Sequence, residues 1–480
     1  MNYRLVLYIC GCILKFESAF LLLPAVTGIF YQEFREALIY VGISTLCIIL
    51  GFLCTLGGSK SNQLYPKEGF VAVSLGWIVM SYFGALPFLF TGEIPSLTDA
   101  LFETISGFTT TGASILSDVE ALSHASLFWR SFTHWIGGMG VFVFVMAILP
   151  MMGGSTMNLM KAESPGPSVG KLVPKVKDTA KILYMIYIFI TIAQIIILLI
   201  CRLPLFDSMT LTFGTVGTGG FGIKNDSIAS YSAAVQNVIT VFMILSGINY
   251  SAYFCILCKQ VKEAFSIEEV RVYLLIILSA VTIICFNTFS LYGTVEETIR
   301  HAFFQVGSII TTTGFATTDF NNWPLLSKTI LVMLMFIGAC AGSTGGGIKV
   351  SRITILFKTI KKELHILMHP RLVKKIKVDG HAVPHEVIRS TNVFIAVYFV
   401  IFFISLLLIS VDNLDFTSSF TAVAATLNNI GPGLDSVGPT SNFACFSVFS
   451  KYVLMFNMLA GRLEIFPMLI LFHPNCWKKH

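Results

Sequence analysis

Charged residues are scarce in this chain. Of its 480 residues only 12% are Asp, Glu, Lys or Arg, whereas soluble domains carry about 25% charged residues. Hydrophobic residues make up 55% of the chain. This composition excludes an ordinary soluble domain and predicts an integral membrane protein with many spans. The net charge of +6 does not indicate nucleic-acid binding, because the basic residues cluster in connections between apolar segments.

The sequence also lacks the residue patterns that covalent chemistry needs. Its 11 cysteines are scattered and mostly lie inside apolar runs, which argues against a disulfide framework. Cys255 and Cys258 form a CxxC pair with no second pair or histidine cluster nearby in sequence, so we interpret the spacing as chance. No Ser-His-Asp, metal-binding or paired-carboxylate pattern occurs at useful spacing. We therefore expect no enzyme activity and no cofactor in this chain.

Apolar segments of about 20 residues, long enough to cross a bilayer, dominate the chain. Two predicted spans lie near 4–30 and 36–57. Four units of similar plan follow, and each has a span, a short apolar segment, a glycine turn and a second span. The fold class expected is an all-α integral membrane protein of ten spans, with the four pseudo-repeated units around a central ion pore. The predicted domains are 1–68 with the two extra spans, 69–152 with pore unit one, 153–260 with a cytosolic loop and unit two, 261–362 with unit three and its intramembrane gating loop, and 363–480 with a cytosolic loop and unit four.

Lysine and arginine concentrate in alternate connections of this ten-span plan. The stretches 161–181 and 349–389 hold most of them. Because basic connections stay on the cytosolic side, both termini are predicted to be cytosolic. The short segments then enter the membrane from outside, and the C-terminal end of each one points to its glycine turn. The partial negative charge at a helix C-terminus favours a cation there.

The four glycine turns are the candidate ion filter. Backbone carbonyls can replace the water around a dehydrated cation, and glycine adopts the backbone angles that this arrangement requires. Non-helical backbone at membrane depth is tolerated only where it is buried in protein or lines water. The candidate filter residues are Thr110, Thr111, Gly112, Val216, Gly217, Thr218, Gly219, Thr312, Thr313, Gly314, Asn429, Ile430 and Gly431.

A second glycine-rich stretch follows the second span of unit three. A helix that reaches Gly338 cannot continue regularly through a run of glycines, each of which costs about 1 kcal/mol in a helix. Arg462 lies within an apolar span, where a charge is expensive. We hypothesise that Arg462 donates hydrogen bonds to carbonyls of 342–347 or adds a positive barrier; alternatively, it only pairs with Glu464 or neighbouring helices. The candidate gate residues are Gly342, Ser343, Thr344, Gly345, Gly346, Gly347, Lys349 and Arg462.

These motifs resemble those of a known family. The turns FTTTGAS, GTVGTGGF, ITTTGF and NNIGPG, in the fourfold plan, are similar to the Trk/Ktr/HKT superfamily of cation transporters. The stretch GACAGSTGGGIK at 338–349 looks like the intramembrane loop of that family, and MLAGRLE at 458–464 looks like its last-helix motif. The likeness runs from about residue 69 to the end. The two extra spans point to the TrkH branch, the membrane subunit of the Trk potassium uptake system.

The resemblance implies a function. It implies filter glycines at Gly112, Gly219, Gly314 and Gly431, and glycine instead of serine at Gly112 implies that potassium is the permeant ion bound there. It further implies a homodimer with one pore per chain, a bacterial cytoplasmic (inner) membrane, and a cytosolic nucleotide-binding regulatory subunit. The stretches 161–181 and 349–389 could contact that subunit or serve only as topology signals. We expect membrane lipid and no nucleic acid as further partners.

A coupled transporter is the alternative function. Potassium entry would then be coupled to protons or sodium, and such folds often use inverted repeats with a site at broken helices. The four units here run parallel, which favours a pore. Proton coupling would need a carboxylate or histidine within the membrane. Glu103 and His134 are the candidates, and either of them could instead be a satisfied polar group of the core.

Overall fold

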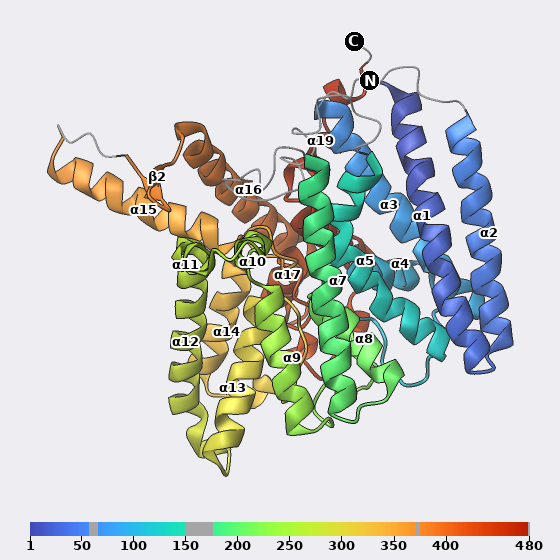
Figure 1. The fold of residues 1–480 in the computed structure, drawn as a ribbon, viewed down its shortest axis with the longest axis horizontal. Coiled ribbons are helices and arrows are strands. Elements are labelled where there is room, and N and C mark those ends of the chain that lie inside the picture. Colours follow the sequence, from blue (N-terminus) through green and yellow to red (C-terminus); the bar gives the residue numbers. More distant parts are fainter. Residues whose placement is uncertain (57–65, 149–175, 371–374, 479–480) are drawn as a thin grey trace.

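The structure, a computed structural model, describes residues 1–56, 66–148, 176–370 and 375–478. The described part is a bundle of helices with both chain ends on one side (Figure 1). Its sheet is a single antiparallel pair, β1 (Lys377–Val378) and β2 (His381–Ala382), beside helix α15. The predicted basic stretch 161–181 lies mostly outside the described residues. In the described residues six short 3-10 helices join the larger elements: η2 (Phe289–Leu291), η3 (Phe320–Asn322), η4 (Ser410–Asp412), η5 (Asp435–Val437), η6 (Phe443–Cys445) and η7 (Pro474–Cys476).

The two N-terminal helices pair with each other at one edge of the bundle (Figure 1). Helix α1 (Tyr3–Phe30) crosses helix α2 (Phe34–Leu56) at two glycines. A Cβ atom built on Gly11 would lie 2.9 Å from the carbonyl oxygen of Gly51, and one on Gly51 would lie 2.9 Å from that of Gly11. Small residues let membrane helices approach this closely. The pair then packs on the first pore unit.

Four units follow in the predicted order. In each unit a long first helix leads to a short pore helix, and a second helix follows the turn. Unit one is α3 (Pro66–Thr91), α4 (Leu97–Phe108) and α5 (His124–Ile148); unit two is α7 (Val176–Ile200), α8 (Leu205–Val216), α9 (Ala233–Ser246), α10 (Tyr250–Leu257) and α11 (Val261–Ser266); unit three is α12 (Glu268–Thr288), α13 (Val295–Ile310), α14 (Leu325–Ile337) and α15 (Val350–Met368); unit four is α16 (His385–Ile409), α17 (Phe416–Leu427), α18 (Val448–Arg462) and α19 (Phe466–Leu471).

Polar side chains cap three of the four pore helices. Ser96 accepts a hydrogen bond from the Asp99 N–H, Thr294 accepts one from Glu297, and Asp415 accepts one from Ser418. These caps satisfy N–H groups that the helix itself leaves unpaired. Helix α8 differs, because it starts after Pro204 without a side-chain cap and Asp207 lies in its first turn. Asp207 therefore lies inside the helix and does not cap it.

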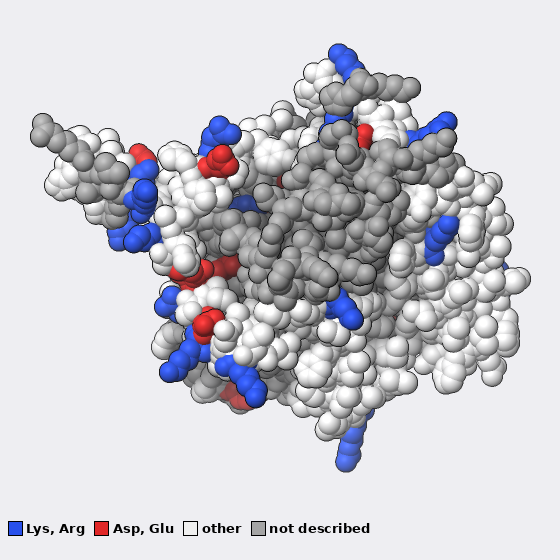
Figure 2. Space-filling view, turned by 45° about the horizontal axis from the view of Figure 1, so that its top comes forward, with Lys and Arg blue, Asp and Glu red and all other residues white. Residues whose placement is uncertain are grey.

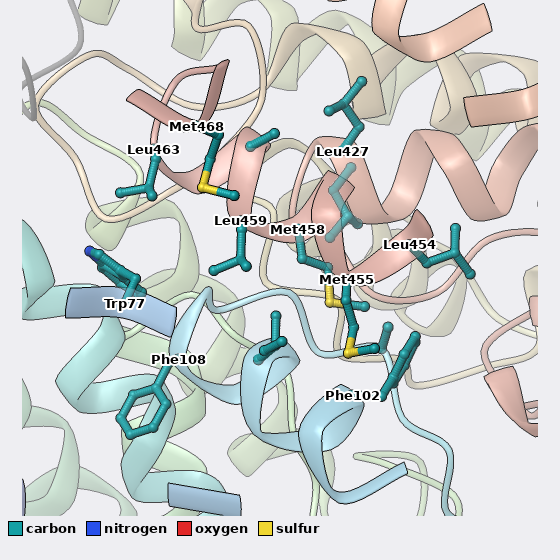
Figure 3. Packing of buried hydrophobic residues seen from close by; sticks show 14 of the residues in the cluster. Trp77, Phe102, Phe108, Leu427, Leu454, Met455, Met458, Leu459, Leu463 and Met468 are labelled. Atoms are coloured by element: carbon teal, nitrogen blue, oxygen red, sulfur yellow. The ribbon is translucent and has the colours of Figure 1, made fainter. Parts of the chain in front are cut away.

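The units close into a ring through their second helices. Helix α5 contacts pore helix α8 of the next unit, α9 contacts α13, α14 contacts α17, and α18 returns to α4. At the last of these junctions Met455 of α18 lies beside Phe102 of α4 in the buried core (Figure 3). The cyclic order brings the C-terminal ends of all four pore helices toward one centre.

The second helices of units two to four are not continuous spans, whereas the sequence predicted a break only after Gly338. Six helices in the described part are long and apolar enough to cross a membrane, or seven if α9 and α10 are one span bent by 91°. Helix α14 ends at Ile337, and α18 ends at Arg462 before the separate helix α19. Backbone with positive φ interrupts both regions, at Gly338 and at Glu464 and Ile465. Spans that read as continuous from hydropathy are therefore broken.

Charged side chains are unevenly spread over the surface. In Figure 2 they gather over the part of the molecule that holds α10 to α12 and α15, whereas the surface over α1 and α2 is largely uncharged. Large apolar side chains are exposed on these two N-terminal helices, among them Leu38 at 72% and Leu53 at 58%. Such a surface is stable against lipid and not against water. The chain is a multi-pass membrane protein.

Candidate functional site

The four turns share one backbone conformation although their sequences differ. In each turn the residue two positions past the pore helix and the glycine two positions later have positive φ angles. Positive φ is costly for residues with a Cβ atom and free for glycine. The pairs are Thr110 and Gly112 (54° and 79°), Thr218 and Gly220 (54° and 80°), Thr312 and Gly314 (58° and 86°), and Asn429 and Gly431 (56° and 98°).

An equivalent main-chain hydrogen bond occurs in each of the four turns. The residue just before each of these glycines donates its N–H to a carbonyl five residues back, over 2.8 Å in units one to three and 2.9 Å in unit four. Both patterns align Gly220, and not Gly219, with Gly112. The predicted register of the second turn is thus one residue too early, since its two consecutive glycines left the choice open. The donor and acceptor pairs are Thr111 with Ser106, Gly219 with Gly214, Thr313 with Ser308, and Ile430 with Ala425.

The four turns meet in a closed ring. A Cβ atom added to Gly112 would overlap the carbonyl oxygen of Gly219, which belongs to the next unit. Gly220 and Gly314 face the next unit in the same way. Gly431 of unit four faces unit one, where its added Cβ atom would lie 2.8 Å from a carbonyl oxygen. Each turn therefore has room for glycine and for no larger residue. The remaining pairs are Gly220 with the oxygen of Thr313, Gly314 with that of Ile430, and Gly431 with that of Thr111.

This ring places main-chain oxygens from four parallel units around one centre. Four pore helices end at it, and their last carbonyls carry partial negative charge. The Thr110 hydroxyl just behind the ring is fully buried and has no hydrogen-bond partner among the described residues. Carbonyl rings of this kind suit a dehydrated monovalent cation. Val216 and Gly217 lie at the C-terminal end of α8, on the pore-helix side of the ring.

A cavity of about 170 Å³ opens on the other face of the ring. Its lining includes all four glycines and the residues that follow them in the turns. The charged lining residues are Arg130 and Lys224. Arg130 is neutralised by the buried Glu103 carboxylate, 2.6 Å from its Nε. The guanidinium also donates to the Gly222 carbonyl oxygen over 2.7 Å, so it ties unit one to the second turn.

Glu103 and His134 are both engaged at this junction between units one and two. Besides Arg130, Glu103 accepts hydrogen bonds from the Ser114 hydroxyl at 3.0 Å and from the Ile115 N–H at 3.0 Å. His134 is buried, with Nδ1 2.8 Å from the Gly107 carbonyl oxygen and Nε2 accepting from the Phe221 N–H at 3.2 Å. Sequence reasoning found both side chains but missed Arg130, their charged neighbour.

The segment 338–349 lies against the pore-helix face of the ring. The Gly346 N–H donates to the Thr312 hydroxyl over 2.6 Å, and a Cβ atom on Gly345 would lie 2.9 Å from the Thr311 carbonyl oxygen. A Cβ atom on Gly346 would overlap the Asn428 carbonyl oxygen. The cavity adjoins residues that follow the turn glycines, whereas this segment contacts residues that precede them. The intramembrane loop and the cavity therefore occupy opposite faces of the ring.

Arg462 contacts the loop directly. Its Nη1 donates to the Thr344 carbonyl oxygen over 2.8 Å and its Nη2 to the Gly137 carbonyl oxygen over 2.5 Å. Glu464 pairs with Arg352 on α15, with 2.5 Å between Oε2 and Nη2. Arg462 thus links the end of α18 to the loop and to α5, which is the hydrogen bond that the sequence hypothesis required.

The other predicted gate residues also lie in this loop. The Ser343 hydroxyl donates to the Cys340 carbonyl oxygen over 2.6 Å, and the buried Lys349 ammonium donates to the Gly345 carbonyl oxygen. Lys349 has φ 84° and ψ 138°, a region that costs a residue with a Cβ atom about 1–3 kcal/mol. Its ammonium bond offsets part of this cost. Gly342 and Gly347 also have positive φ, at 70° and 79°.

The described residues contain no cluster of three or more His, Cys, Asp or Glu that could hold a metal ion. Cys255 and Cys258 are free thiols in the structure.

Comparison with known proteins identifies the family. The family model TrkH, described as "Cation transport protein", matches residues 41–479. This chain belongs to the TrkH family. The Trk system potassium uptake protein TrkH of Salmonella typhimurium is 37% identical over 100% of both chains. The TrkG protein of the Escherichia coli Trk system is 35% identical over 99% of both.

A solved TrkH structure has the same fold. The crystal structure of the potassium transporter TrkH from Vibrio parahaemolyticus matches with a TM-score of 0.89 and 34% identity, and covers 100% of both chains. The predicted family and the predicted all-α membrane fold are confirmed. The two N-terminal helices that pointed to the TrkH branch lie inside this full-length match.

Proposed function

We propose that this chain takes up potassium across the cytoplasmic membrane through a pore whose filter is the ring of four turns. The observation that carries the proposal is the closed ring, in which each glycine with positive φ faces a carbonyl oxygen of the next unit. Such a ring replaces an ion's hydration shell with main-chain oxygens. The name of the Salmonella relative, a potassium uptake protein, supports potassium as the ion.

The intramembrane loop is the proposed gate. It fills the pore-helix face of the ring, where Gly346 is bonded to Thr312 and packs against Asn428. An ion that leaves the ring on this face meets the loop. Arg462 holds Thr344 of the loop and adds a positive charge beside the path. Conduction then requires the loop to move, and Arg462 stabilises the obstructing position.

Coupled transport is the second candidate, because intramembrane ionisable residues often form proton relays. Here Glu103 and His134 hold structural hydrogen bonds on the backbone of the first two turns. Taking up a proton would weaken the Arg130 pair of Glu103 or the Phe221 bond to His134, which favours the pore. Currents that reverse at the potassium equilibrium potential support the pore, and flux that follows an imposed pH gradient supports coupling.

The assembly is also a proposal. The membrane subunit is proposed to form a homodimer with one pore per chain and to bind a cytosolic nucleotide-binding regulatory subunit. The Trk system names of the relatives support a multi-component system. We place the protein in the bacterial inner membrane with both termini cytosolic. The shared side of the two chain ends in Figure 1 agrees with that orientation.

The test of the filter is potassium uptake in bacteria that lack their own uptake systems, with Gly112→Ser beside the parent. A serine Cβ at this position would overlap the Gly219 carbonyl oxygen and displace a ring oxygen. We expect the variant to lose its preference for potassium over sodium. Gly92→Ser is the matched control, because Gly92 also has positive φ (82°) but has no atom within 4 Å of its added Cβ. Equal selectivity of parent and Gly112→Ser contradicts the proposal.

A further inference from the structure

A buried carboxylate fastens both ends of the intramembrane loop. Glu269 lies in the first turn of α12 and is 8% exposed. Its Oε1 accepts the N–H of Ala341 at 2.6 Å and the N–H of Ser351 at 3.1 Å. These two residues bracket the glycine-rich segment that contacts the turns. A single side-chain oxygen thus holds the loop where it begins and where α15 begins.

The break between α9 and α10 binds the same loop from another side. The Cys340 N–H donates to the Gly247 carbonyl oxygen over 3.1 Å, and the Tyr250 N–H donates to the Gly342 carbonyl oxygen over 3.1 Å. The 91° bend leaves main-chain groups of unit two without helical partners. They pair instead with the loop of unit three. Unlike these main-chain contacts, the Glu269 contact depends on a side chain that can be replaced without changing the backbone.

The chemistry of Glu269 suits a clamp. An ionised carboxylate accepts several N–H bonds, and such charge-assisted bonds are about twice as strong as neutral ones. A buried carboxylate is unfavourable unless these bonds are made. Displacing the loop would therefore remove two N–H partners from Glu269 at once. That penalty resists loop movement without any contact between Glu269 and the permeant ion.

We propose that Glu269 is a positioning residue that holds the loop in its obstructing position by binding both ends of 341–351. The inference rests on the proposed gating role of the loop. Glu269 acts through the loop backbone and touches neither the filter ring nor the ion path. Its loss frees the loop, raises the fraction of time that the pore is open and leaves the filter unchanged.

The neighbouring residue connects this clamp to the molecular surface. Glu268 pairs with Lys358 of α15, with 2.5 Å between Oε1 and Nζ. The Glu268 N–H donates to the Asp379 carboxylate, in the turn between β1 and β2, over 2.6 Å. Consecutive residues of α12 therefore hold the surface hairpin and the buried loop.

The test combines two measurements on purified full-length protein. Hydrogen exchange reports the protection of the Ala341 and Ser351 amides, and single-channel recording in planar bilayers separates open probability from unitary conductance. For Glu269→Ala we expect both amide exchange and open probability to rise by about tenfold, the equilibrium effect of losing a hydrogen bond to a charged group. Glu269→Gln keeps an acceptor oxygen and should fall between Glu269→Ala and the parent. Glu263→Gln, an exposed carboxylate on α11, is the control and should match the parent in both measurements.

The outcomes separate this inference from the proposed function. Faster exchange with a higher open probability, at constant unitary conductance and potassium selectivity, supports both. Faster exchange at constant open probability retains the clamp but contradicts the loop as a gate. Unchanged exchange in both Glu269 variants overturns the clamp. A changed conductance or selectivity at constant open probability also overturns it, because Glu269 would then act on the filter.

Discussion

The four turns and the four second helices show opposite kinds of variation. The turns differ in sequence, from Thr-Thr-Thr-Gly to Asn-Asn-Ile-Gly, yet all four have the same pair of positive φ angles. The second helices all read as apolar spans, yet α5 is continuous, α9 and α10 bend by 91°, α14 leads into the loop, and α18 stops at Arg462. The four turns share one backbone shape with different side chains, whereas the four second helices share an apolar composition with different backbone paths.

This difference separates two physical demands. A ring of carbonyl oxygens requires every unit to contribute the same backbone shape, whereas the side chains can vary. Obstruction of the path requires one element to differ from the others, and among the described residues only unit three supplies a long loop there. Units two and four bind that loop through main-chain groups at Gly247 and through Arg462. The proposed pore is therefore nearly fourfold at its filter and strongly asymmetric at its gate.

The largest expected effect comes from breaking the ring at the second turn. Gly220→Ala places a Cβ onto the Thr313 carbonyl oxygen and adds the cost of positive φ, about 1–2 kcal/mol. We expect potassium uptake by intact cells to fall by more than about tenfold. Gly92→Ala carries the same backbone cost in open space and should retain uptake. If Gly220→Ala transports as well as Gly92→Ala, the common backbone shape has no role in conduction.

The next largest expected effect is on open probability, and it comes from removing Arg462 at the proposed gate. Arg462→Ala removes the hydrogen bonds to Thr344 and Gly137, so the obstructing position of the loop loses stability. We expect open probability to rise by about tenfold for one charge-assisted hydrogen bond, measured in planar bilayers. Arg462→Lys keeps the positive charge but cannot make both bonds in the same geometry, and should show a smaller rise. Arg389→Ala, at an exposed arginine of α16, is the control. Unchanged open probability and regulation in Arg462→Ala contradict the gate role.

The smallest expected effect is on thermal stability, and it comes from removing one of two pore-helix caps, Asp415 or Ser96. Hydrogen bonds from Ser418 lower the pKa of Asp415 below its usual value. A lowered pKa in the folded state adds stability above the unfolded pKa of about 3.9, and that stability is lost as pH falls through the folded pKa. Asp415→Asn should therefore lower the melting temperature in detergent at pH 7, and the difference from the parent should shrink near pH 3. Ser96→Ala removes a cap that does not titrate, so its effect should not depend on pH in this range. Equal pH dependence for both variants would remove Asp415 ionisation as the cause.

Much of this arrangement could be predicted from sequence, because some signals are local. The turns repeat a Thr-Gly pattern between apolar runs, and Arg462 stands out as a charge inside a span. The register at Gly219 and Gly220 could not be fixed, since either glycine satisfies the pattern. The break at Ile465 carries no local signal, because a β-branched residue rarely has positive φ. Glu269 lies about 70 positions before the loop that it binds, so only the folded chain brings them together.

The most direct test of the ring is to locate a bound ion. Crystals of the protein soaked in rubidium, and examined by anomalous scattering, should show a cation at the centre of the ring. The oxygens around it should be those of Thr111, Gly219, Thr313 and Ile430, the four that face the neighbouring glycines. A rubidium ion bound elsewhere along the path, with none inside this ring, would contradict the account.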